Sequence, residues 1–116
     1  MQPKASTIFT MKDNKKSASV RVGRPIEILL KGNPTTGYTW TRLGFAGKET
    51  LSDDSLQVVV EFSATESTPG LVGAGGLYRV TVTPNHKGHH TLQLLYTRLF
   101  DVRVDDEKYI LHLHAE

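Results

Sequence analysis

Apolar and polar residues alternate in short runs along this chain, and turn-forming residues separate the runs. A repeat of two residues is typical of β-strands with one buried and one exposed face. In the last run, Tyr109 lies on the face expected to be buried, and His112 and His114 lie on the opposite face. The pattern predicts eight strands, at residues 5–10, 17–22, 25–31, 38–43, 56–62, 77–83, 90–98 and 108–115.

Short strands separated by turns, with no convincing helical period between them, predict an all-β fold. The number and spacing of the strands favour an immunoglobulin-like antiparallel β-sandwich of about seven to eight strands. A chain of 116 residues suits one core, so residues 1–116 are interpreted as a single domain. Trp40 alternates with Tyr38 in an early strand and is expected to lie in that core.

Charge and composition exclude several classes of function. The 14 Lys and Arg residues are scattered and nearly balanced by 12 Asp and Glu residues, so a nucleic-acid partner is not expected. No apolar run is long enough to span a membrane. The sequence also lacks a large exposed apolar stripe that would favour self-association, so a monomer is expected. The first twenty residues show no secretory signal, which favours the cytoplasm and leaves a vesicular, lysosomal or released location as the alternative.

The sequence offers no convincing catalytic or cofactor site. It has no cysteine, which excludes a disulfide, a thiolate metal site and a cysteine nucleophile. The glycines of residues 70–80 precede a strand-like segment rather than the helix that a dinucleotide fingerprint needs. No cofactor is expected, and the histidines are interpreted as exposed residues rather than metal ligands: His86, His89, His90, His112 and His114.

Residues 33–38, Asn-Pro-Thr-Thr-Gly-Tyr, predict a rigid hairpin or loop turn. Asn33 can bond to its own backbone, Pro34 fixes one backbone angle, and Gly37 can adopt a conformation barred to other residues. Such a turn is common by itself. Here it is followed by Gly-Ala-Gly-Gly at residues 73–76 and by an arginine within Tyr-Thr-Arg-Leu-Phe at residues 96–100.

These three motifs, in this order, resemble those of the chagasin-type inhibitors of papain-like cysteine peptidases, and the similarity runs from about Val20 to Leu113. The resemblance implies an immunoglobulin-like sandwich with three peptidase-binding loops at one end. The implied central wedge is Asn33, Pro34, Thr35, Thr36, Gly37 and Tyr38. The implied second loop is Leu71, Val72, Gly73, Ala74, Gly75 and Gly76, and the third contributes Arg98 and Phe100.

The third loop departs from the family pattern, because Arg98-Leu99-Phe100 stands where Arg-Pro-Trp is usual. Without the proline, the loop is expected to be looser and to lose more entropy on docking. The resemblance still implies a reversible, non-covalent, tight-binding inhibitor of cathepsin L-type and B-type peptidases, and not an enzyme. An immunoglobulin-like binding or adhesion module and a histidine-based metal enzyme are the alternatives.

Overall fold

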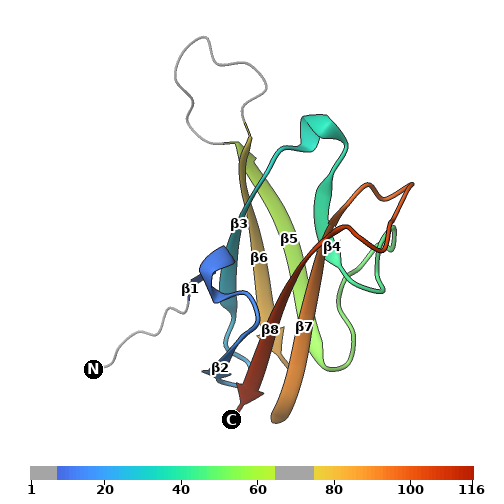
Figure 1. Ribbon diagram of the computed structural model, residues 1–116. Coiled ribbons are helices and arrows are strands. Elements are labelled where there is room, and N and C mark those ends of the chain that lie inside the picture. Colours follow the sequence, from blue (N-terminus) through green and yellow to red (C-terminus); the bar gives the residue numbers. More distant parts are fainter. Residues whose placement is uncertain (1–7, 65–74) are drawn as a thin grey trace.

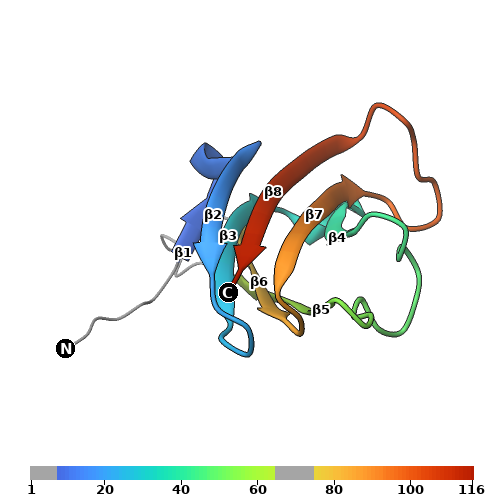
Figure 2. The ribbon, with the colours of Figure 1, turned by 90° about the horizontal axis from the view of Figure 1, so that it is seen from below.

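The computed structural model describes residues 8–64 and 75–116, and within them the chain forms eight strands and two short 3-10 helices. Two four-stranded sheets, in the orders β1-β3-β6-β5 and β2-β8-β7-β4, face each other (Figures 1 and 2). The predicted all-β sandwich is confirmed. The elements are β1 (Ile8–Thr10), η1 (Met11–Asp13), β2 (Lys16–Val20), β3 (Ile26–Gly32), η2 (Pro34–Thr36), β4 (Thr39–Arg42), β5 (Leu56–Ala64), β6 (Gly76–Pro84), β7 (Gly88–Thr97) and β8 (Glu107–Ala115).

Strand direction differs from the prediction in the N-terminal segment. The β3–β6, β5–β6, β4–β7 and β7–β8 pairs are antiparallel as expected, but β1 pairs with β3, and β2 with β8, in parallel. The physical reason is that η1 passes the chain from one sheet to the other. Because β1 and β2 lie in different sheets, they do not pair with each other as a hairpin. Each pairs instead with a strand distant in the sequence, β3 or β8, and runs in the same direction as that strand.

Polar side chains fix this N-terminal segment to β8. The Tyr109 hydroxyl donates a hydrogen bond to the Thr10 carbonyl at 2.9 Å. The Asn14 side chain donates to the Lys108 carbonyl at 3.3 Å and accepts from the Ile110 N–H at 2.8 Å. Burial and the charge of Asp13 raise the pKa of the Tyr109 phenol, so this hydroxyl stays protonated.

The core lies between the sheets and follows the predicted alternation. Tyr109, on the face of β8 expected to be buried, is fully enclosed, and His114 on the other face is exposed. Trp40 is buried as expected, and its indole N–H donates to the Lys31 carbonyl at 3.0 Å. Within residues 8–64 and 75–116, no helix has the length and apolar character needed to cross a membrane.

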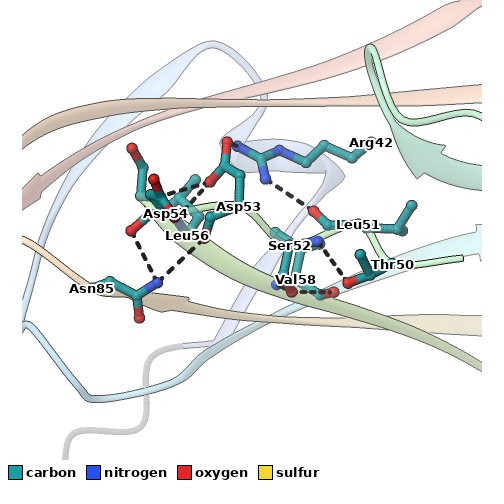
Figure 3. Close-up of polar contacts among 10 residues, drawn as sticks. Arg42, Thr50, Leu51, Ser52, Asp53, Asp54, Leu56, Val58 and Asn85 are labelled. Carbon is teal, nitrogen blue, oxygen red and sulfur yellow. Dashed lines mark hydrogen bonds and ion pairs between the residues drawn. The ribbon is translucent and has the colours of Figure 1, made fainter. Parts of the chain in front are cut away.

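A polar network holds the connection between β4 and β5 (Figure 3). The buried Arg42 guanidinium donates to the Leu51 carbonyl at 2.9 Å and to the Asp53 carboxylate at 3.1 Å. The other Asp53 oxygen accepts from the backbone N–H groups of Ser55 and Leu56, both at 2.9 Å. The connection between β4 and β5 therefore depends on the Asp53 carboxylate, whose charge changes with pH.

Asp53→Asn is expected to destabilise the protein at pH 7 by about 1 kcal/mol, a modest cost because the Asp53 side chain is 41% exposed. Partial burial opposes the charge, but the N–H groups of Leu56 and Ser55, together with Arg42, hold the pKa of Asp53 below its usual value. Its contribution is therefore present above about pH 4 and is lost as the pH falls through the lowered pKa.

Urea unfolding at pH 7 and pH 3 checks this expectation, and Asp54→Asn is the matched control because that neighbouring carboxylate is exposed and forms no ion pair with the described residues. The stability difference between wild type and Asp53→Asn should shrink at the lower pH. An equal difference at both pH values contradicts the role of the charge.

Candidate functional site

Residues 33–38 form a tight turn whose local chemistry agrees with the prediction. The Asn33 side-chain oxygen accepts from the Thr35 N–H at 3.1 Å, and Pro34 occupies the first turn of η2. Gly37 has a φ of 88°, in the left-handed region, and its N–H donates to the Pro34 carbonyl at 3.0 Å. A residue other than glycine would be strained there. We call residues 33–38 the wedge.

Of the two predicted forms, a hairpin or a loop turn, the wedge is a loop turn between the two sheets. It joins β3, in the sheet that contains β6, to β4, in the sheet that contains β7. The chain therefore crosses from one sheet to the other at the end of the sandwich, where η2 stands above the strands (Figure 1). The two strands contribute to a shared core from opposite sides, which a hairpin within one sheet cannot do.

Both threonine hydroxyls of the wedge bond within the turn. Thr35 Oγ1 donates to the Asn33 side-chain oxygen at 2.6 Å. Thr36 Oγ1 donates to the Asn33 carbonyl at 2.7 Å and accepts from the Tyr38 N–H at 3.4 Å. Although Thr35 and Thr36 are exposed, their hydroxyls stiffen the turn and are not simply free for a partner.

Aromatic residues from both sheets support the wedge from below. The Tyr96 ring centre lies 5.3 Å from that of Tyr38 and 5.1 Å from that of Trp40. The Tyr96 hydroxyl accepts from the Asn33 N–H at 3.0 Å, and the Tyr78 hydroxyl donates to the Tyr38 carbonyl at 3.4 Å. Sequence reasoning did not identify Tyr78 and Tyr96 as site residues. Tyr78 gave no signal beyond its place in a strand pattern, whereas Tyr96 is the first residue of the third motif.

The second predicted loop is described only where it enters β6. Gly76 pairs with Gly32 across the β3–β6 ladder. A Cβ atom built on Gly75 would lie 2.5 Å from the Gly32 carbonyl oxygen, so the backbones approach too closely for a side chain. The end of this loop therefore lies directly against the base of the wedge. Four predicted site residues fall outside the described residues: Leu71, Val72, Gly73 and Ala74.

The third loop contacts the wedge through Arg98. The guanidinium carbon lies 4.9 Å from the centre of the Tyr38 ring, in a cation–π arrangement. A Cβ atom built on Gly37 would lie 3.7 Å from Arg98 Nε, which is buried and has no hydrogen-bond partner among the described residues. Phe100, in contrast, is 82% exposed. The two predicted residues of this loop thus have different surroundings.

A carboxylate braces the third loop at its base. Asp106 Oδ2 accepts from the Thr97 hydroxyl at 2.6 Å and from the Arg103 N–H at 2.7 Å. The hydrogen bond from the Thr97 hydroxyl, and to a smaller extent the one from the Arg103 N–H, holds the pKa of Asp106 below its usual value. The looseness expected from the missing proline is therefore opposed by side-chain bonds, which the sequence pattern did not reveal.

The histidines lie at the other end of β7 and do not converge on a metal. His89 is near the start of β7, and its ring stacks on His112 with centres 5.6 Å apart and planes 12° from parallel. The ring centre of His114 is 4.9 Å from that of His89. Stacked rings do not direct their nitrogen atoms at one point. In the part of the chain that the structure describes, no three histidine or acidic side chains are grouped to hold a metal ion.

Comparison with known proteins adds to this geometry. Residues 19–114 match the family model described as chagasin family peptidase inhibitor I42. Chagasin of Trypanosoma cruzi is 33% identical over 107 residues, which are 91% of this chain and 94% of chagasin. The solved structure of Leishmania mexicana ICP is 46% identical, has a TM-score of 0.71, and covers 97% of this chain and 91% of its own.

A more distant likeness is to the structure of PbICP-C in complex with falcipain-2. It has a TM-score of 0.58 and 21% identity, and it covers 96% of this chain and 91% of that chain. At this level of identity the likeness concerns the fold alone. The residues that match the family model include all three predicted loops.

Proposed function

The chain belongs to the chagasin family (I42) of cysteine peptidase inhibitors, and we propose that it is a reversible, non-covalent, tight-binding inhibitor of papain-like peptidases of the cathepsin L and B types. In this proposal the wedge enters the active-site cleft, and the second and third loops contact its two sides. The observation that carries the proposal is the internally bonded wedge, at the same end of the sandwich as the third loop (Figure 1). The match to the chagasin family of peptidase inhibitors over residues 19–114 supports the class of partner.

The physical basis for blocking the cleft is preorganisation. A papain-like site holds a cysteine thiolate beside a histidine, with hydrogen-bond donors for the developing oxyanion. The wedge is already folded by the bonds of Asn33, Thr36 and Gly37, so it loses little conformational entropy when it enters such a site. The occupied cleft then excludes substrate.

Titration of active-site-titrated papain and of a cathepsin L-like enzyme tests the proposal, with a fluorogenic peptide as substrate and a serine peptidase as control. Stoichiometric loss of cysteine-peptidase activity alone is expected. Full activity in the presence of excess folded protein would contradict inhibition and would favour an immunoglobulin-like binding module with another partner.

The wedge itself is expected to resist cleavage. Residues 34–36 form a 3-10 turn rather than an extended strand, so their carbonyl groups are not presented to the thiolate in a near-attack geometry. Prolonged incubation with excess peptidase, followed by intact-mass measurement, should show the bonds of residues 33–38 unbroken. Rapid, specific cutting within this segment would contradict a non-covalent, non-substrate mode of binding.

A further inference from the structure

The connection between β7 and β8 exposes more apolar surface than Phe100 alone. Leu99 is 46% exposed, Val102 48% and Val104 94%. Val104 is more exposed than Phe100, although an isolated valine gains nothing from contact with water. Neither Val102 nor Val104 belongs to the motifs that predicted the binding loops.

Two consecutive turns present these side chains. The Asp101 N–H donates to the Arg98 carbonyl at 2.9 Å and closes a turn that carries Phe100. The Asp106 N–H donates to the Arg103 carbonyl at 3.2 Å and closes a second turn that carries Val104. The polar groups of this segment therefore close its own turns, while apolar side chains face outward.

Side chains brace both turns. The Arg103 guanidinium donates to the Asp101 carboxylate at 3.1 and 3.0 Å. The Lys108 ammonium donates to the Val104 carbonyl at 3.0 Å, and Asp106 holds the base of the loop. The residues on both sides of the exposed valines are thus held by hydrogen bonds to neighbouring segments. A loop ordered before binding gives up less entropy when its apolar side chains are covered.

We propose that Val102 and Val104 form a second apolar anchor, beyond Phe100, which packs on an apolar surface of the peptidase beside its cleft. This inference rests on the proposed inhibitory function and extends the same binding surface. The β7–β8 connection then determines which peptidase dissociates most slowly from the inhibitor. Apolar contacts at the edge of a shared interface act mainly on the dissociation rate.

The size of the patch favours the peptidase over a second copy of this chain. A stable protein interface takes about 20–30 residues from each partner. The few apolar side chains of this loop cannot supply such an interface alone. They can extend one that the wedge and Phe100 already provide, because residues 98–106 and η2 lie at the same end of the sandwich (Figure 1).

The test compares wild type, Val104→Ser and Val104→Ile in their inhibition of papain and of a cathepsin L-like enzyme. Val22→Ser is the matched control, because Val22 is exposed and its N–H donates to the carbonyl of the C-terminal residue Glu116, at the end of the sandwich opposite η2 (Figure 1). We expect Val104→Ser to raise the inhibition constant about 3- to 30-fold for the peptidase that wild type holds longer, through faster dissociation. Val104→Ile should recover most of this loss, and Val22→Ser should match wild type.

Several outcomes would overturn the anchor. If Val104→Ser inhibits both peptidases as well as wild type does while Phe100→Ala is weaker, the inhibitory function stands and the anchor does not exist. If Val104→Ser changes the sedimentation of the free protein but not its inhibition, the patch binds a second copy instead. If wild type inhibits neither enzyme, the proposed function fails and this inference fails with it.

Discussion

Replacement of Thr36 by alanine is expected to weaken the inhibition of papain by about 1–3 kcal/mol, the range of a central contact in an interface. Two physical effects contribute. The Thr36 hydroxyl closes the wedge through its 2.7 Å bond to the Asn33 carbonyl, so its loss frees a turn that must then be ordered on binding. The methyl group is also lost from the exposed surface of the turn.

Two further variants separate these effects. Thr36→Ser keeps the hydroxyl and should keep most of the affinity if closure of the turn is what matters. Thr36→Val keeps the shape without the hydroxyl and should show most of the loss. Inhibition constants against papain measure both. An unchanged constant for Thr36→Ala would mean that the wedge is not the central contact.

Gly32→Ala is expected to lower the free energy of unfolding by about 1–3 kcal/mol, the usual cost of overpacking. A Cβ atom at this position would lie 2.5 Å from Tyr78 Cε1 and 3.2 Å from Tyr96 Cε1. Neither ring can move freely, since Tyr78 packs on Phe62 with ring centres 4.9 Å apart and Tyr96 packs on Trp40. Because both tyrosines bond to the wedge, inhibition should weaken as well.

Urea unfolding and inhibition of papain measure the two consequences of Gly32→Ala. Lys31→Ala is the control on the same strand, because the Lys31 side chain is exposed. Tyr96→Phe removes only the hydroxyl that accepts from the Asn33 N–H, so it should weaken inhibition more than it lowers stability. Wild-type stability in Gly32→Ala would show that the rings accommodate the added carbon.

Local sequence patterns were sufficient to predict the features that depend on neighbouring residues. The alternation of side chains predicted the strands and the buried face of β8, because successive residues of a strand point to opposite sides. The roles of Asn33, Pro34 and Gly37 were also readable, since each acts within the backbone of its own turn. The three motifs indicated the family, and the matched family model confirms it.

The pairing of the strands and the support of the wedge depend on contacts between residues far apart in the chain. Alternation does not specify a partner, so neither the parallel pairing of β1 and β2 nor the passage of the wedge between sheets could be predicted. The bond from Asn33 to Tyr96 joins residues 63 positions apart, and the stacking of Arg98 on Tyr38 is equally non-local. Such contacts depend on how the two sheets meet, which no local pattern encodes.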